Sequence, residues 1–134
     1  MFEAKRTVHF SDCDPAGVMF FAKTMEFCHS AYEDFINSFN LNFDYWGSDS
    51  FAVPIKQAEV SFLKTIKHGE EVTINLKVLE IRDSSFLIEY FIKNNNGEIC
   101  LQAKTVHVFV SKKNWKKIEI DSAVKESLSK FLEQ

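Results

Sequence analysis

Two carboxylates, Asp12 and Asp14, stand two positions apart in a short segment that continues with Pro15, Ala16 and Gly17. A carboxylate can attack an electrophilic carbonyl carbon directly, or it can remove a proton from a water molecule that attacks. A thioester carbonyl is already electrophilic, so one carboxylate and a group that polarises the carbonyl are chemically sufficient. The same two residue types are typical of turns and helix caps, and their spacing alone favours that structural interpretation.

A long apolar helix is expected directly after this segment. The stretch 18–40 contains no Gly or Pro, and its apolar residues recur at alternating steps of four and three, as on one helical face. The first N–H groups of a helix have no helical partner and lie at the positive end of the helix dipole. We therefore expect the backbone N–H groups of Phe21 and Ala22 to polarise a carbonyl beside Asp14. The residues of the expected apolar face are Phe21, Met25, Cys28, Tyr32, Phe35 and Phe39.

Four later stretches alternate between apolar and polar residues, and each predicts a half-buried strand. They are residues 58–62, 72–78, 86–93 and 105–110, and short polar turns between them favour antiparallel hairpins. In the last stretch the alternation predicts that the valines, rather than Thr105 and His107, face the core. A short strand over 4–11 is expected before the helix. Asp121 is expected to cap a final helix whose apolar face is Val124, Leu128, Phe131 and Leu132.

These elements predict an α+β protein in which a curved antiparallel sheet of about five strands wraps one long central helix, followed by a short C-terminal helix. This architecture is the hotdog fold. A chain of 134 residues fits one domain, so we expect a single hotdog domain over residues 1–134. The sheet would keep open edges, which favours edge-to-edge pairing in a homodimer or a dimer of dimers.

Composition narrows the range of functions. The net charge of −3 and the lack of a basic stripe argue against nucleic-acid binding. No apolar run approaches the ~18 residues that a membrane-spanning helix needs, so no membrane interaction is expected. Three cysteines without a Cys-x-x-Cys pair favour a reducing cytoplasm. Asp12, Asp14 and His29 lack a recognised metal-ligand spacing, so neither a metal nor another cofactor is expected.

A family resemblance changes the interpretation of the Asp12–Asp14 segment. The run 10–21, Phe-Ser-Asp-Cys-Asp-Pro-Ala-Gly-Val-Met-Phe-Phe, resembles the signature of the 4-hydroxybenzoyl-CoA thioesterase family. In that signature an aromatic residue precedes Asp-x-Asp-x-x-Gly, and a mostly apolar helix follows. Residues 58–74 are similar to the family's second strand, turn and third strand. The resemblance implies that Asp14 is the catalytic carboxylate and that Gly17 is the glycine of the motif.

The resemblance also implies a reaction and a quaternary structure. Family members hydrolyse acyl-CoA thioesters to a free acid and CoA, and they are dimers with the active site at the subunit interface. The segments 17–21 and 27–33 are similar to the 1,4-dihydroxy-2-naphthoyl-CoA hydrolase branch, so an aromatic acyl group is expected, with 4-hydroxybenzoyl or a medium chain as alternatives. A basic residue before the fourth strand contacts CoA phosphate in some relatives, which implies Arg82 here.

Three questions stay open at this point. His29 lies at the edge of the apolar helix face, where it would either orient water or contact the acyl group, or be a buried structural histidine with Glu26 and Glu33 near it. The acyl group could arrive on an acyl-carrier protein, because a cluster of lysines over 112–117 would attract an acidic carrier. A non-catalytic acyl-CoA-binding hotdog protein, in which Asp14 only caps a turn, is the third possibility.

Overall fold

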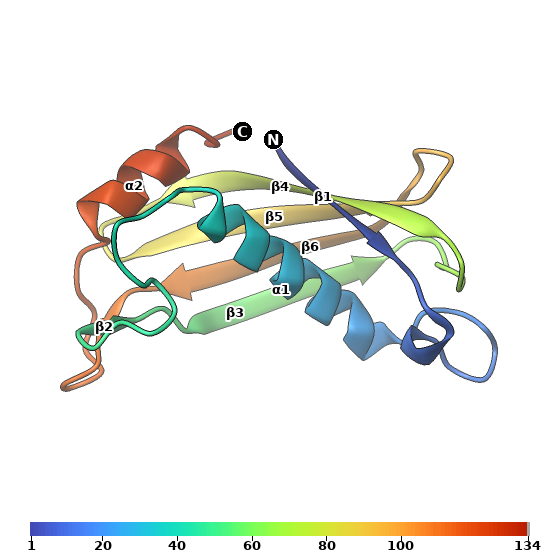
Figure 1. The fold of residues 1–134 in the computed structure, drawn as a ribbon, viewed down its shortest axis with the longest axis horizontal. Helices are drawn as coiled ribbons and strands as arrows, with labels where there is room; N and C mark the ends of the chain where they lie inside the picture. The colour runs from blue at the N-terminus through green and yellow to red at the C-terminus, as the bar shows by residue number, and fades with distance from the viewer. Residues whose placement is uncertain (134) are drawn as a thin grey trace.

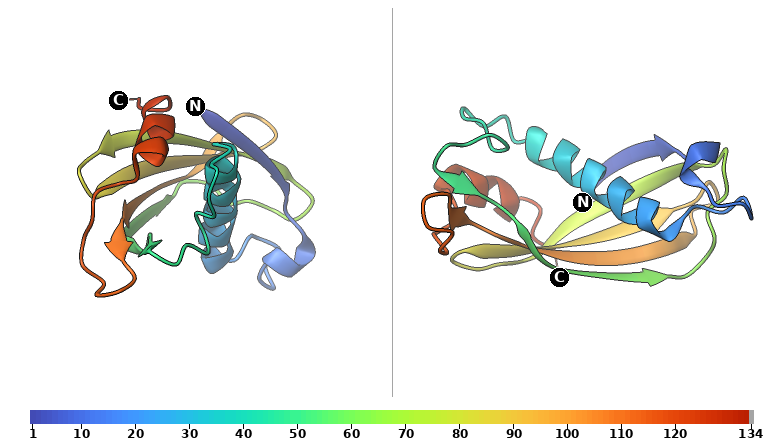
Figure 2. Two further views of the ribbon diagram at one scale, coloured as in Figure 1. Left: turned by 60° about the vertical axis from the view of Figure 1, so that its left-hand side comes forward. Right: turned by 90° about the horizontal axis from the view of Figure 1, so that it is seen from below.

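A five-stranded antiparallel sheet curves around one long helix (Figures 1 and 2). The computed structural model describes residues 1–133. The helix is α1 (Phe21–Asn37), and the sheet has the strand order β1 (Phe2–Thr7), β4 (Glu71–Ile81), β5 (Ser85–Lys93), β6 (Ile99–Val108) and β3 (Ile55–Phe62). A 3₁₀ turn (Phe10–Asp12), a two-stranded sheet of β2 (Phe51–Ala52) with β7 (Val110–Ser111), and helix α2 (Ser122–Ser129) complete the chain.

The two central strands follow the predicted alternation. On β4 and β5 every second side chain points toward the helix and is at most 1% exposed, while most of the residues between them are partly exposed. A tight turn joins the two strands, in which the Arg82 N–H donates to the Ser85 carbonyl over 2.8 Å. The inward residues are Val72, Ile74, Leu76 and Val78 on β4, and Phe86, Ile88, Tyr90 and Ile92 on β5.

Helix α1 lies on the concave face of the sheet and packs closest to β1 and β4. Its buried residues include Cys28, Tyr32 and Phe35, as predicted. The helix begins at Phe21 and not at Val18, because Val18 forms a β-bridge with Lys67 instead. Phe21 was expected on the buried face, but its side chain is 65% exposed. The apolar face therefore starts one turn later than the sequence pattern predicts.

The predicted orientation of β6 is wrong from Thr105 to His107, although Val108 and Val110 are buried as expected. Thr105 and His107 point into the core and are 2% and 0% exposed, whereas Val106 lies on the other face and is only half-buried. The inward face is continuous with Leu101 and Ala103 on the same strand. Hydrogen bonds explain why the two polar side chains are tolerated there, since each finds a partner inside the protein.

Strand β3 was expected to be half-buried, and in the single chain it is not. All of its residues are exposed, because it is the last strand of the sheet and α1 lies nearer the opposite edge. Three large apolar side chains along it, Ile55, Val60 and Phe62, are 42%, 36% and 53% exposed. One edge of the sheet thus presents apolar side chains and an open strand to solvent.

The remaining predictions differ in their outcome. The first strand ends at Thr7 and not at Ser11, because the 3₁₀ turn starts at Phe10. Asp121 caps α2 as expected, its Oδ1 accepting from the N–H groups of Ala123 and Val124. Leu132 lies beyond the helix and is 46% exposed. Strands β2 and β7 were not predicted. Within residues 1–133, no helix has the length and apolar character needed to cross a membrane.

Candidate active site

Asp14 sits at the start of a tight hairpin loop that precedes α1. The loop is closed by two hydrogen bonds of 2.9 Å, from the Gly17 N–H to the Asp14 carbonyl and from the Asp14 N–H to the Val18 carbonyl. Gly17 has a φ of 80°, the left-handed conformation that such a loop requires after its turn and that glycine adopts without strain. The Asp14 Oδ1 accepts from the Ala16 N–H over 2.9 Å. The backbone thus holds the carboxylate by one of its two oxygens.

This loop is joined directly to the start of α1. The Phe20 N–H donates to the Asp12 carbonyl over 2.9 Å, and Cys13 and Met19 form a β-bridge. None of the described side chains caps the helix at its first residue. The N–H groups of Phe21 and Ala22, which were predicted to polarise a carbonyl, therefore open a helix whose N-terminus has no side-chain acceptor.

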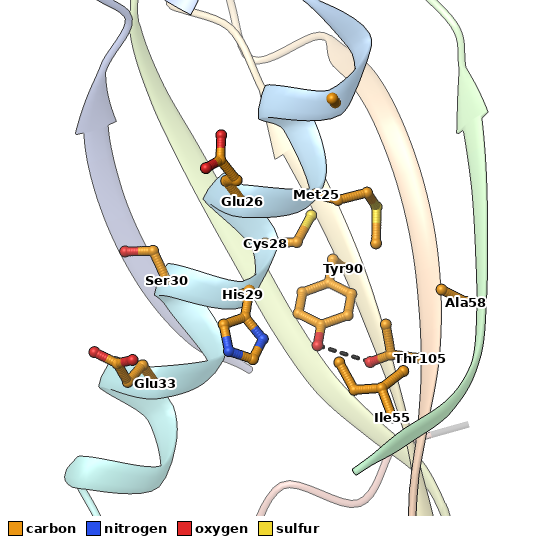
Figure 3. A pocket seen from close by; sticks show the side chains of 11 residues that line it. Met25, Glu26, Cys28, His29, Ser30, Glu33, Ile55, Ala58, Tyr90 and Thr105 are labelled. Carbon is orange, nitrogen blue, oxygen red and sulfur yellow. Dashed lines mark hydrogen bonds between the residues drawn. The ribbon is translucent and has the colours of Figure 1, made fainter.

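A pocket of about 510 Å³ lies between α1 and β3, and the side chains of β5 and β6 form its floor (Figure 3). This volume falls in the range typical of small-molecule sites. The pocket exists because α1 packs closest to β1 and β4, which leaves space on the side of β3. Its walls are mainly apolar, with Ala22 and Met25 on the helix and Ala58 on β3.

The structure brings together only some of the predicted site residues. Ala22 lines the pocket at the N-terminal end of its helix wall, and His29 lines it about two turns later. Asp14, Gly17 and Phe21 do not line it, and they lie at or just before the start of α1. In a single chain the candidate carboxylate and the candidate acyl pocket are therefore neighbours and not one cavity.

His29 is exposed and points into the pocket, so its interpretation as a buried structural histidine is wrong. Its ring stands 5.6 Å from that of Tyr32. No hydrogen bond joins it to Glu26 or Glu33 in the described part of the chain; Glu26 instead pairs with Lys23 over 3.1 Å. His29 is thus free to contact a bound molecule or water.

Arg82 lies on the outer face of the sheet, away from this pocket. It shares a hollow of about 310 Å³ with Lys56 and Lys104, and Glu59 also lines this hollow. Its guanidinium donates to both carboxylate oxygens of Glu80, over 2.9 and 3.0 Å. The hydrogen bond from Arg82 lowers the pKa of Glu80. Three cationic groups thus meet on one face, although one of them is paired.

Comparison with known proteins identifies the family. Residues 8–128 match the family described as the thioesterase-like superfamily. The chain belongs to this superfamily. It is 34% identical over 111 residues to a 1,4-dihydroxy-2-naphthoyl-CoA hydrolase of Crocosphaera subtropica, with 81% of each chain covered. It is 31% identical over 133 residues to the hydrolase of the same name from Trichodesmium erythraeum, with 97% and 96% covered.

Solved structures give the same result for the fold. A 1,4-dihydroxy-2-naphthoyl-CoA thioesterase from Synechocystis superposes with a TM-score of 0.90 at 25% identity, covering 96% of this chain and 95% of its own. The predicted hotdog fold, the predicted family and the prediction of a thioester hydrolase are therefore confirmed.

The floor of the pocket in this thioesterase holds a group of polar side chains that the sequence interpretation missed. The hydroxyl of Tyr90 lies 2.8 Å from Thr105 Oγ1, which lies 2.7 Å from His107 Nε2. The His107 ring stacks between Phe86 and Tyr32, at 4.9 and 4.3 Å. Burial, and to a lesser extent the charge of His29, lowers the pKa of His107 to about 3. The spacing of Thr105 and His107, two positions apart on one face of β6, was the only signal in the sequence.

The surroundings of Cys28 argue against a nucleophilic role, and the residues considered for a metal site lie apart. Cys28 lines the pocket, but burial raises the pKa of its thiol to about 12, so the nucleophilic thiolate is scarce at neutral pH. Asp12, Asp14 and His29 do not come together, and residues 1–133 contain no cluster of three His, Cys, Asp or Glu side chains placed to hold a metal ion.

Proposed function

We propose that this protein hydrolyses an aromatic acyl-CoA to the free acid and CoA, with Asp14 as nucleophile or general base. One observation carries the proposal: the loop that fixes the Asp14 carboxylate is hydrogen-bonded to the uncapped start of α1. A carboxylate and backbone donors are thus adjacent in one rigid unit. The relatives' names favour 1,4-dihydroxy-2-naphthoyl-CoA as the substrate. The pocket volume is compatible with a two-ring acyl group.

The proposed chemistry needs few groups. The thioester carbonyl oxygen binds at the N–H groups of Phe21 and Ala22, where the helix dipole favours the negative charge that develops. As a general base, Asp14 takes a proton from water while the water oxygen bonds to the carbonyl carbon. The tetrahedral intermediate then collapses, the carbon–sulfur bond breaks, and the CoA thiolate leaves and is protonated. As a nucleophile, Asp14 would instead form an acyl anhydride that water hydrolyses.

We further propose that the active site is completed in a homodimer, or in a dimer of such dimers. The open strand β3 and its exposed side chains Val60 and Phe62 are the features that a second copy would cover. Phe10, Phe20 and Phe21 around the Asp14 loop are also exposed, at 71%, 43% and 65%. Pairing through β3 would place a partner beside the open side of the pocket. The separation of Asp14 from the pocket in one chain is compatible with a site shared by two chains.

The outer hollow is the proposed site for the CoA nucleotide. Arg82, Lys56 and Lys104 there offer cationic groups to phosphate. CoA is part of the substrate, so the proposed reaction uses no separate cofactor. Cys13, Cys28 and Cys100 are unpaired, which is compatible with a reducing cytoplasm as the place of action.

Two alternatives are each supported by a specific observation. Four lysines over 112–117 surround Trp115, which is 59% exposed, and this surface would suit an acidic acyl-carrier protein. The hydrogen bond from Ala16 to Asp14 is the bond of a turn-capping aspartate, as a non-catalytic acyl-CoA-binding protein would have. The first alternative predicts faster hydrolysis of carrier-linked thioesters, and the second predicts binding without thiol release.

The test is thiol release from a panel of aromatic and aliphatic acyl-CoAs by the wild type and by Asp14→Asn. Asparagine keeps an oxygen to accept from Ala16, so the turn is preserved while the carboxylate is lost. We expect kcat to fall by about 10³-fold or more, as for removal of a general base or nucleophile. Asp12→Asn is the matched control, because Asp12 also accepts from a backbone N–H, that of His9. A loss below about tenfold in Asp14→Asn would exclude the assigned role.

A further inference from the structure

Tyr90, Thr105 and His107 form a chain of hydrogen bonds whose donors and acceptors can be assigned, because the inner end of the chain, His107, has no further partner among the described residues. All three side chains are at most 2% exposed. Tyr90 and Thr105 line the pocket, and His107 lies behind them, stacked between two aromatic rings. The chain therefore runs from the pocket wall into the core (Figure 3 shows its outer bond).

The protonation state of His107 decides which group donates in each hydrogen bond. The pKa of His107 is about 3, so the ring is neutral near pH 7 and carries one N–H. Its Nδ1 has no hydrogen-bond partner among residues 1–133, whereas Nε2 lies 2.7 Å from Thr105 Oγ1. A buried N–H without an acceptor is rarer in proteins than a buried acceptor without a donor. The hydrogen therefore belongs on Nε2, and His107 donates to Thr105.

The next two bonds follow by elimination. The only hydrogen-bond partners of Thr105 Oγ1 in the described chain are the His107 ring and the Tyr90 hydroxyl. Since Nε2 carries a hydrogen and is no acceptor, the Thr105 hydrogen goes to the Tyr90 oxygen. The hydrogen of Tyr90 is then left without an acceptor inside the protein. Tyr90 lines the pocket, so its O–H is available to a molecule bound there.

We propose that Tyr90 is a specificity-determining residue that donates a hydrogen bond to an oxygen substituent of the acyl group, with Thr105 and His107 as positioning residues. The pocket would then prefer an aromatic ring that bears a hydroxyl or oxo group over the bare ring. This inference rests on the proposed function, because it concerns the acyl group in that same pocket. Met25, Cys28 and Ala58 line the same pocket with apolar groups, so a directed donor such as the Tyr90 hydroxyl has a large effect there.

The test compares pairs of substrates in one enzyme sample. The pairs are 2-naphthoyl-CoA with 1,4-dihydroxy-2-naphthoyl-CoA, and benzoyl-CoA with its three monohydroxy isomers. Wild type is expected to prefer the hydroxylated member of at least one pair by about tenfold or more in kcat/KM, and Tyr90→Phe should reduce that ratio to within about threefold. The ratio does not depend on the fraction of folded enzyme, so a loss of stability in the variant does not affect it.

Two further comparisons test the direction of the bonds. Aminobenzoyl-CoA isomers carry a donor of similar size that is a poor acceptor, so they should show no such preference; an equal preference for amino and hydroxyl groups would overturn the assigned direction. Thr105→Val should lower the hydroxyl preference, and Thr105→Ser, which keeps the hydroxyl, should restore it. A purely structural role for Thr105 would change the rates with both members of a pair equally.

Binding separates this inference from the proposed hydrolysis. Non-hydrolysable thioether analogues of the same pairs are titrated into both enzymes by calorimetry. If no substrate releases thiol, but wild type binds the hydroxylated analogue more tightly and Tyr90→Phe does not, the proposed hydrolysis is wrong and the role of Tyr90 stands. If thiol is released but the wild-type kcat/KM ratio of hydroxylated to bare substrate stays within threefold, or is unchanged in Tyr90→Phe, the role of Tyr90 is wrong and the proposed hydrolysis stands.

Discussion

The two sides of helix α1 differ in how completely they are packed. Toward β1 and the C-terminus, the Phe35 ring is fully buried and lies 5.3 Å from Phe2 and 4.9 Å from Phe131. On the same side, Arg6 of β1 donates to Asp34 over 2.6 Å and fixes the helix to the edge strand. Toward β3, the same helix faces the pocket and an edge strand whose residues are all exposed.

This difference teaches that one helix can both close a core and leave a pocket open when it lies off-centre in the sheet. The helix packs closest to β1 and β4, and the aromatic contacts on that side are those of an ordinary core. The displacement leaves the floor of β5 and β6 uncovered toward β3. The pocket is thus a consequence of where the helix packs, and no insertion or separate domain is needed to form it.

The largest expected effect is on stability, and it tests the side of α1 that packs toward β1. Phe35→Ala removes a fully buried ring and should lower the free energy of unfolding by about 3–5 kcal/mol, measured by denaturant titration. Phe21→Ala is the matched control, because it is the same residue type on the same helix but 65% exposed. It should cost less than about 1 kcal/mol in the single chain. Equal costs would mean that the two sides are packed alike.

The next effect is on assembly and activity, and it tests the side of α1 that faces β3. Val60→Lys places a charge on the exposed edge strand, where the proposed partner would bind. We expect sedimentation to show single chains in place of dimers, and kcat/KM to fall about hundredfold because the shared site is no longer assembled. Ile99→Lys, at a 40% exposed position at the start of β6, should change neither property. A dimeric and fully active Val60→Lys variant would show that β3 is not the interface.

The smallest expected effect tests whether His107, beneath the pocket floor, is as well shielded from water as the core on the β1 side of α1. His107 has a folded-state pKa of about 3, against 6.5 for the unfolded chain. The unfolded state therefore binds more protons between these values, so stability is fully present above pH 6.5 and is lost as the pH falls toward 3. At pH 5 this loss amounts to about 2 kcal/mol.

Its measurement is denaturant unfolding at pH 7 and pH 5. His107→Gln keeps a donor toward Thr105 but does not titrate, so its stability should change less between the two pH values than that of wild type. His9→Gln, at an exposed position, should behave like wild type. If His107→Gln and wild type lose the same amount of stability, the floor is not closed to protons.

Much of the fold could be predicted because local patterns decide it. The alternation on β4 and β5, the apolar face of α1 and the Asp121 cap all follow from short-range sequence rules. The orientation of β6 could not be predicted in this way, because Val106 is more apolar than its neighbours Thr105 and His107. Those two face inward because Tyr90 on the neighbouring strand completes their hydrogen bonds, which only the folded structure shows. Strand β3 is exposed in the single chain, and its burial would depend on the proposed partner.

The candidate site shows the same division. The Asp14 loop and the start of α1 are adjacent in sequence, so their proximity was predictable. The pocket is formed by residues far apart in the chain, such as His29, Ala58 and Tyr90, and depends on the off-centre position of the helix. Spacing in the sequence carries no information on that position. The separation of Asp14 from the pocket was likewise visible only in the structure.

The bond between Asp14 Oδ1 and the Ala16 N–H has a consequence for conformational entropy. A free aspartate side chain moves among several rotamers, and each turnover would then require it to be ordered again. Here the Ala16 N–H favours one rotamer when the loop folds, and it engages Oδ1 and not Oδ2. In the proposed reaction the ordering of the carboxylate is therefore completed once, during folding, and does not add to the barrier of each catalytic cycle.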